Sequence, residues 1–216
     1  MAEDNLPYIY GLELPTRALA TAKATEDDIV FFIGTQSLRT ENQLVSVTFD
    51  EDSSTAIPII YSHKCGEIWQ IISSPSEKQV VATVYSSYDE SNAKTSCQVW
   101  KLPELDDEKD VCPSPTENSN MQSLQSLAKL DHSDTPSVVS SSWHPEEANM
   151  IAVFSTESVV IWDIERNKQS KLADIPSRSR LYTGVWSPHR KCSEVFLLCD
   201  STLKIIDSTS GQQVCT

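Results

Sequence analysis

Short apolar runs separated by polar residues dominate the chain. Clear examples are Ile29–Ile33, Gln79–Tyr85, Met150–Phe154 and Glu194–Leu198. Their β-branched and aromatic residues, their shortness and the Ser, Pro, Asn and Asp residues around them favour strands over helices. A helical spacing of apolar residues occurs in Met121–Leu130, and that segment is short. The pattern therefore predicts an all-β chain.

The strands belong to a repeat. Each copy contains a Trp-x-Pro sequence, then a strand, then a large apolar residue followed by Asp. Two copies are complete: Trp143–Pro145 with Trp162–Asp163, and Trp186–Pro188 with Ile206–Asp207. Pro145 and Pro188 are 43 residues apart, and Asp163 and Asp207 are 44 apart. The four-stranded blade of a β-propeller repeats every ~40–45 residues. The repeat predicts a WD-repeat β-propeller, with Ser74-Pro75 and Trp100 marking a third copy.

The repeat assigns structural roles to its large and acidic side chains. Trp100 and Trp162 are expected to anchor third strands between neighbouring sheets, and Asp163 and Asp207 to end those strands. We expect Trp143 and Trp186 to pack between blades near the ends of inner strands. The proline after each of these two residues suits a position that donates no ladder hydrogen bond.

Four blades fit the chain as one partial propeller over residues 1–216. Their predicted bounds are about 8–63, 66–131, 137–175 and 181–216, the last incomplete. Tyr8–Leu14 is expected to form the inner strand of the first blade or to pair with another blade. Propellers of this repeat type usually need more blades to close. We therefore expect the N-terminal part of a seven-bladed propeller, with one blade face left unpaired.

An acidic insertion, predicted over residues 104–125, interrupts the second blade between its third and fourth strands. A polar, proline-rich surface loop is the simpler interpretation. The alternative is a partner-docking segment in which Ser114-Pro115 suits a proline-directed kinase. Its candidate docking residues are Glu104, Asp106, Asp107, Glu108 and Asp110.

The negative charge of the chain argues against nucleic acids and anionic membranes as partners. With 31 acidic against 17 basic residues, the net charge is -14. Such a chain lacks the positive electrostatic field that binding to nucleic acids or anionic membranes requires. No apolar stretch is long enough to span a membrane, and residues 1–5 do not resemble a secretory signal. The six cysteines show no CxxC spacing, so reduced thiols in a cytoplasmic protein are expected.

Motifs for catalysis and cofactor binding do not occur in the sequence. It has no nucleophile elbow, P-loop or His-Glu-x-x-His. His63 with Cys65, and His189 with Cys192, each supply two candidate metal ligands, whereas structural zinc normally takes four. We therefore expect no enzyme activity, cofactor or metal, and interpret these histidines as turn residues.

Trp69 is the tryptophan with two open interpretations. It lies six residues before Pro75, toward the start of a predicted inner strand. There it either faces the opening of the central channel, where propellers commonly bind partners, or belongs to the core.

Several segments, in order, resemble a known family, the EARP- and GARP-complex-interacting proteins. They are Tyr10–Glu13, Arg17–Leu19, Gly34–Leu38 with Asn42-Gln43, Gly66–Trp69 with Ser74-Pro75, and Trp186–His189. Gly-Thr-Gln-Ser-Leu and Gly-Glu-Ile-Trp are much more specific than the blade pattern. The resemblance extends from about Tyr8 to Asp207.

The resemblance implies a seven-bladed WD-repeat propeller without catalytic activity. It further implies a scaffold that binds the EARP and GARP vesicle-tethering complexes in endosomal retrieval and recycling, peripherally at endosomes and the trans-Golgi network. The chain departs from the family in lacking its C-terminal blades and in carrying Ile206-Asp207 where Trp-Asp is usual.

Two other functions remain open from the sequence. The chain is alternatively an adaptor of another pathway, such as a ubiquitin-ligase substrate receptor, because fold alone does not distinguish these functions. A propeller hydrolase would need carboxylates or histidines converging at one channel mouth, and the spacing shows none.

Overall fold

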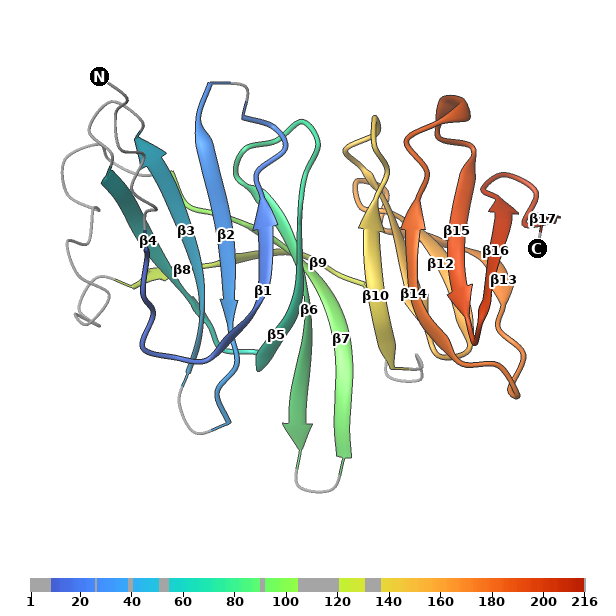
Figure 1. The fold of residues 1–216 in the computed structure, drawn as a ribbon, viewed down its shortest axis with the longest axis horizontal. Coiled ribbons are helices and arrows are strands. Elements are labelled where there is room, and N and C mark those ends of the chain that lie inside the picture. The colour runs from blue at the N-terminus through green and yellow to red at the C-terminus, as the bar shows by residue number, and fades with distance from the viewer. Residues whose placement is uncertain are drawn as a thin grey trace, which may run out of the picture.

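The described strands form four sheets, which we call blades 1 to 4 (Figure 1). The computed structural model describes residues 9–25, 27–38, 41–50, 55–89, 92–104, 121–130 and 137–215. Blade 1 contains β1 (Thr16–Thr21), β2 (Ile29–Thr35), β3 (Asn42–Asp50), β4 (Thr55–His63) and β8 (Gln122–Ser123). Blade 2 contains β5 (Glu67–Ser73), β6 (Val80–Asp89), β7 (Asn92–Lys101) and β9 (Gln125–Lys129).

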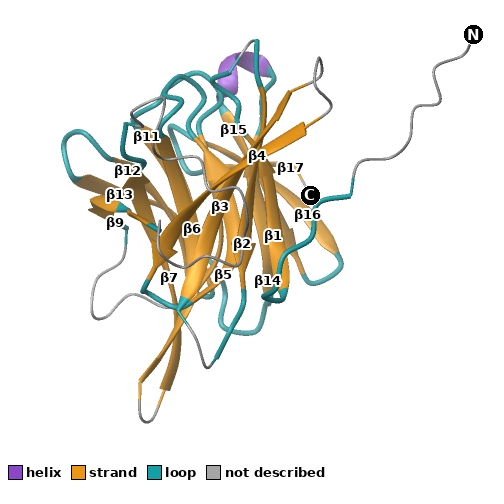
Figure 2. Cartoon of the chain, turned by 90° about the vertical axis from the view of Figure 1, so that its left-hand side faces the viewer, coloured by secondary structure: helices purple, strands orange, loops and turns teal. Residues whose placement is uncertain are grey.

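Blades 3 and 4 are antiparallel meanders of four strands. Blade 3 contains β10 (Val138–Trp143), β11 (Met150–Ser155), β12 (Ser158–Asp163) and β13 (Lys168–Asp174). Blade 4 contains β14 (Leu181–Trp186), β15 (Glu194–Cys199), β16 (Thr202–Asp207) and β17 (Gln213–Cys215). A 3₁₀ turn, η2 (Arg190–Cys192), joins β14 to β15, and strands account for nearly all other regular structure described (Figure 2). The predicted all-β propeller fold is confirmed.

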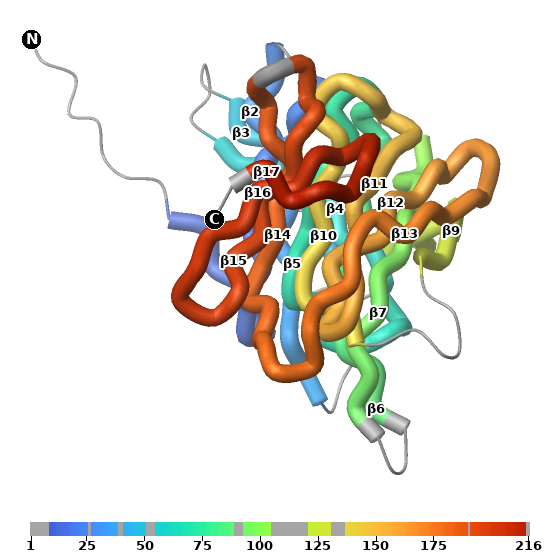
Figure 3. The backbone as a smooth tube through the Cα atoms, turned by 90° about the vertical axis from the view of Figure 1, so that its right-hand side faces the viewer, coloured from blue at the N-terminus to red at the C-terminus, as the bar shows by residue number. Residues whose placement is uncertain are grey.

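The inner strands β1, β5, β10 and β14 are neighbours in chain order (Figures 1 and 3). They run in the same direction, from the lower to the upper edge of Figure 1. We call the lower edge, where these strands begin, the starting end, and the upper edge the finishing end. Every hairpin loop therefore belongs to one of the two ends.

Apolar clusters fill the spaces between consecutive blades. Leu44 and Ile68 lie in the cluster between blades 1 and 2, and Val99 and Ile151 in the one between blades 2 and 3. Between blades 3 and 4, a Cβ on Gly184 would lie 2.3 Å from the Phe154 ring. No other residue fits there without displacing the ring, so close packing requires this glycine.

Side chains, rather than backbone ladders, connect neighbouring inner strands. The Gln70 amide donates to the Ser141 carbonyl (3.1 Å) and accepts from the Ser141 amide (2.8 Å), which joins β5 to β10. Ser142 Oγ accepts from the Trp186 amide (2.9 Å), which joins β10 to β14. Ser73 Oγ donates to a carbonyl of β1 (2.9 Å). These hydrogen bonds hold the four inner strands in a defined register.

The outer face of blade 1 is covered by a non-strand segment. Tyr10 and Leu12 pack with Met121 against the buried Val45 and Ile60. The expectation that residues 8–14 form an inner strand or pair with another blade was wrong for the described residues 9–14. The inner strand is β1, because its small alternating residues fit between the blades while Tyr10 and Leu12 cover the apolar face.

The end of the predicted insertion also differs from the expectation. Gln122 and Ser123 pair in parallel with Tyr61 and Ser62 at the edge of blade 1, before the chain enters β9 of blade 2. Residues 121–125 are therefore part of the propeller rather than of a loop. The polar residues Gln122 and Ser123 suit a short edge strand.

The outer face of blade 4 carries exposed apolar side chains. Val185, Leu198 and Leu203 come from three adjacent strands and are each more than one-third exposed. Their neighbours in the strand, such as Trp186 and Leu197, point toward blade 3 and are buried.

Candidate protein-binding rim

All four inner strands contain a β-bulge four residues before their last residue. The pairing register between the first and second strands skips one residue in each blade. A bulge leaves one residue without a partner and redirects its side chain. We call the four bulged residues at the starting end the bulge rim: Arg17, Trp69, Val139 and Tyr182.

Two bulged residues from different blades stack on each other. The guanidinium carbon of Arg17 lies 4.7 Å from the centre of the Trp69 ring. Trp69 remains 37% exposed, although its neighbour Ile68 is fully buried. The bulge therefore turns an indole away from the core and places a cation over it, an attractive cation–π arrangement.

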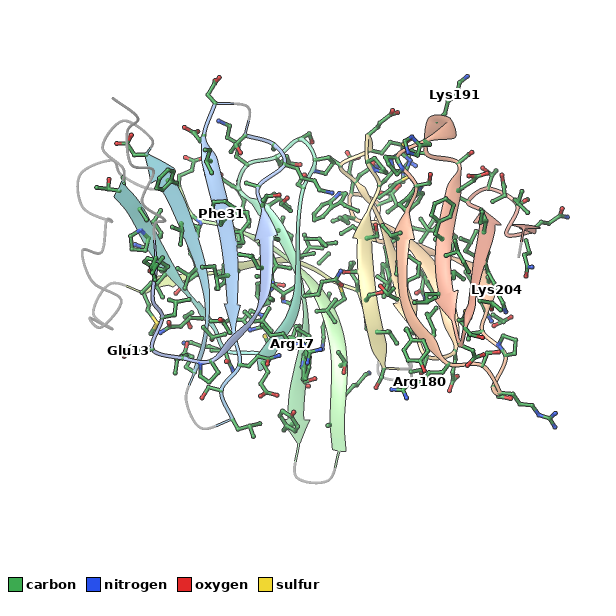
Figure 4. All side chains as sticks on the ribbon, in the orientation of Figure 1. Glu13, Arg17, Phe31, Arg180, Lys191 and Lys204 are labelled. Atoms are coloured by element: carbon green, nitrogen blue, oxygen red, sulfur yellow. The ribbon has the colours of Figure 1, made fainter. Side chains whose placement is uncertain are left out.

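A second arginine–aromatic stack lies at the rim in blade 4. The Arg180 guanidinium carbon is 5.1 Å from the centre of the Tyr182 ring, which is 49% exposed. Asp200 holds the backbone of Arg180, accepting its amide hydrogen bond at 2.9 Å. Figure 4 shows Arg17 and Arg180 along the same lower edge of the molecule, opposite Lys191.

A groove of about 670 Å³ adjoins this second stack. It opens where blades 3 and 4 meet, and its wall combines apolar side chains with both charges. The residues that line the groove include Val139, Glu157, Ile175, Arg180, Leu181 and Tyr182.

The β6–β7 hairpin extends beyond the other strands at the starting end (Figures 1 and 2). Near its tip, the exposed Tyr88 hydroxyl donates to Glu67 Oε2 at 2.7 Å. This hydrogen bond to the carboxylate raises the pKa of Tyr88. The contact anchors the hairpin to the start of β5, two residues before Trp69.

The finishing end uses its large residues for packing. Trp143 and Trp186 are almost fully buried, and their indole N–H groups donate to Ala148 (2.8 Å) and Cys192 (2.6 Å) carbonyls of the next turn. In blades 2, 3 and 4 the residue after the inner strand caps that turn. His144 Nδ1 accepts from the amides of the second and third residues that follow it, at 3.2 and 2.9 Å.

Serine provides the same cap in two other blades. Ser74 Oγ accepts from the amides of residues 76 and 77 in blade 2, and Ser187 Oγ accepts from the His189 amide in blade 4. Burial lowers the pKa of His144, which favours the neutral ring that can accept these hydrogen bonds.

The predicted third-strand residues lie in packing and turn positions. Trp162 is buried between blades 2 and 3. Asp163 accepts from the Arg166 amide (3.0 Å), and Asp207 accepts from the Ser210 amide (2.7 Å). The hydrogen bonds from Ser210 and Thr209 lower the pKa of Asp207. The blade-anchoring roles of these residues stay predictions.

Trp100 belongs to a buried hydrogen-bond network with a histidine. Its indole N–H donates to Thr83 Oγ1 at 2.8 Å, and the same oxygen lies 3.1 Å from His63 Nε2. His63 Nδ1 is 3.1 Å from the Gly66 carbonyl, which can only accept, so Nδ1 carries the proton. Burial lowers the pKa of His63 to about 4.

His63 is therefore a core residue rather than a simple turn residue, because its ring is 1% exposed and both nitrogens have partners. In the described part of the chain, no three His, Cys, Asp or Glu residues gather as metal ligands do. Burial raises the pKa values of Cys65, Cys192 and Cys199. The same described ranges contain no helix with the length and apolarity to cross a bilayer.

The acidic docking candidates are almost all outside the described residues. Glu104 is exposed at the end of the segment that follows β7. Asp106, Asp107, Glu108 and Asp110 lie outside the described ranges. The docking role of this insertion stays a prediction.

Sequence reasoning identified Trp69 but missed its three rim neighbours. Arg17, Val139 and Tyr182 each lie four residues before the end of an inner strand, as Trp69 does. An alignment of the four repeats on their inner strands would have placed these residues in one column. The bulge itself leaves no signal in one strand, because it depends on pairing with another.

Four sheets packed face to face, with bulged inner strands, define a WD-repeat β-propeller. The chain belongs to the family described as EIPR1 beta-propeller, which matches residues 6–215. It is 33% identical to EARP and GARP complex-interacting protein 1 of Homo sapiens, over 98% of this chain and 57% of that protein. It is 28% identical to the WD repeat-containing protein DWA2 of Arabidopsis thaliana, over 83% of this chain and 49% of that one.

A solved propeller shares the fold at low identity. The Chaetomium thermophilum Sqt1 structure, bound to the N-terminus of ribosomal protein L10, gives a TM-score of 0.60 at 12% identity. The alignment covers 94% of this chain and 63% of Sqt1. The alignment with the human EARP and GARP complex-interacting protein 1 shows that this chain spans a little over half the length of that relative.

Proposed function

We propose that this chain is a non-catalytic adaptor that binds EARP and GARP vesicle-tethering complexes in endosomal retrieval and recycling. The family and the names of its 33% identical relatives support this proposal. The adaptor acts in the cytoplasm, at endosomes and the trans-Golgi network, as a peripheral protein.

The bulge rim is the observation that carries the proposal. Trp, Tyr and Arg are the residue types that contribute most to the affinity of protein interfaces. The starting end presents all three, exposed, on blades 1, 2 and 4, and strands position Arg17, Trp69 and Tyr182. Rigid presentation reduces the conformational entropy lost on binding.

The chemistry of the rim supports adaptor activity rather than catalysis. Arginines and aromatic side chains predominate there, whereas a propeller hydrolase needs converging acids, bases or nucleophiles. The buried His63 hydrogen-bonds within the propeller, to Gly66 and Thr83.

Affinity purification of the tagged chain from cytosol, followed by mass spectrometry, tests this function. We expect EARP or GARP subunits with the wild-type chain, and about a tenfold loss or more with Trp69→Ala or Tyr182→Ala, as for interface hot spots. Leu127→Ala, an exposed apolar residue on β9 away from the rim, is the matched control and should recover the same subunits.

Recovery of ubiquitin-ligase subunits in place of tether subunits would replace the proposed function by the other adaptor hypothesis. Equal recovery by the wild type and both rim variants would move the binding site away from the bulge rim.

A further inference from the structure

We propose that the bulge rim, together with the neighbouring Arg180, binds an acidic, extended peptide segment. The carboxylates of this segment pair with Arg17 and Arg180, and its apolar side chains contact Trp69 and Tyr182. This inference rests on the proposed function, because it gives the chemistry of the partner at the same surface. The rim would then select its partner by charge as well as by shape.

The two arginines have hydrogen-bonding capacity to spare. Each guanidinium carbon lies over an aromatic ring, at 4.7 Å for Arg17 and 5.1 Å for Arg180, and a ring face is a weaker hydrogen-bond acceptor than a carboxylate. Within the described ranges, neither guanidinium forms an ion pair with a carboxylate. A planar guanidinium with a free edge matches a carboxylate through two parallel hydrogen bonds.

Some exposed cations of the chain pair with nearby acids. Arg166 pairs with Asp163 at 3.2 Å, and Lys78 pairs with Asp28 at 3.6 Å. Arg17 and Arg180 are instead placed over aromatic rings, one in blade 1 and one at the entry to blade 4. The rim therefore offers two separated anion contacts, which suits a chain of residues better than one small anion.

The aromatic rings and the groove specify the rest of the occupant. Trp69 and Tyr182 expose apolar surface directly beside the two cations. The groove next to Tyr182 is lined by Ile175 and Leu181 and by the carboxylates of Glu157 and Asp174. It therefore suits an apolar side chain of the segment rather than an acidic one. Since successive side chains of an extended peptide alternate in direction, acidic and apolar residues at alternate positions match this arrangement.

The net charge of -14 makes such binding selective. At long range the chain repels acidic proteins, and at physiological salt this repulsion is screened beyond ~8 Å. Contacts within hydrogen-bond distance are screened much less. An acidic segment therefore binds only where it can reach the arginines and the rings together.

A fluorescence-anisotropy titration with labelled peptides tests the inference. The probe is a fluorescein-labelled peptide in which Glu alternates with Leu and Ser, and its match carries Gln in place of Glu. We expect the Glu peptide to bind the 216-residue chain about tenfold more tightly than the Gln peptide, the usual effect of a charged hydrogen-bond partner. The double variant Arg17→Gln with Arg180→Gln should remove this preference, whereas Arg166→Gln should keep it.

A charge exchange sharpens the test. The variant Arg17→Glu with Arg180→Glu should prefer the corresponding Lys peptide to the Glu peptide. Equal binding of the Glu and Gln peptides to the wild-type chain would overturn the inference, as would binding of a phosphoserine peptide alone.

The two proposals fail separately. One outcome is that rim variants lose the tether complex in purification while the wild-type chain binds the Glu and Gln peptides equally. In that case the adaptor function stands and the proposal of an acidic partner is wrong. If the charged peptide binds at the rim and no tether subunit is recovered, the proposed function is wrong and the acidic-peptide site remains.

Discussion

The two ends of the inner strands use similar residues in opposite ways. At the finishing end, Trp143 and Trp186 are buried, with indole N–H groups bonded to carbonyls of the next turn. At the starting end, Trp69 and Tyr182 are exposed beneath arginines. Residue type is shared between the ends, and the local backbone separates their roles.

The β-bulge is what makes the difference. In a regular strand, alternate side chains enter the spaces between blades and become core. One extra residue interrupts that alternation and sends a large side chain to solvent. The finishing end thus supports the fold, and the starting end is available for a partner. Substitutions at the two ends should therefore have separable effects on stability and on binding.

Replacing Trp186 should have the largest effect on stability. Trp186→Ala removes a 3% exposed indole and its hydrogen bond to Cys192, which should cost about 3–5 kcal/mol of unfolding free energy. Urea denaturation measures this loss. The matched control is Tyr182→Ala, an aromatic residue on the same strand, and an equal loss in both variants would contradict the distinction between the two ends.

Acid should weaken the buried layer that supports the starting end. His63 has a folded-state pKa of about 4, below its usual 6.5, so the unfolded chain binds more protons between these values. Stability is therefore full above pH ~6.5 and falls as the pH drops toward 4, by about 3 kcal/mol.

Unfolding measured across this pH range, in the wild type and His63→Gln, isolates the contribution of this histidine. The wild-type curve should fall more steeply between pH ~6.5 and ~4 than the variant curve. Parallel curves would show that His63 does not titrate as its burial requires. His144, whose pKa burial also lowers, contributes equally to both proteins.

Rim substitutions should have the smallest effect on stability. Trp69→Ala and Tyr182→Ala remove exposed side chains, so the unfolding free energy should change by no more than about 0.5 kcal/mol. Chemical denaturation of these purified variants, beside Leu127→Ala, checks this. A loss above 2 kcal/mol in a rim variant would make that residue part of the core and remove the main support for a binding role.

The repeat made most of the fold predictable. The turn prolines, the apolar runs and the third-strand residues Trp100, Trp162 and Asp163 predicted a β-propeller. The structure has four blades in that order. The segment 8–14 was misassigned, because an apolar residue that covers a sheet face looks the same in sequence as one within a strand. Residues 121–125 were misassigned because a short edge strand is nearly as polar as a loop.

The candidate site was less predictable than the fold. Trp69 was predicted either to face the channel opening or to belong to the core, and its side chain is 37% exposed. The capping function of His144 resembled that of Ser74 and Ser187 only after the turns were seen. The His63–Thr83–Trp100 network joins residues from three strands. No spacing rule connects them.

Periodicity along the chain by itself determined the strand class and the blade repeat, because both depend on residues near one another in sequence. Composition alone determined the acidic character of this protein. Tertiary structure alone decided which aromatic residues face solvent. Arg17 reaches Trp69 only when blades 1 and 2 pack together, and each bulge exists only in the register between two paired strands. These are properties of pairing between distant segments, so the binding surface appears when the blades assemble.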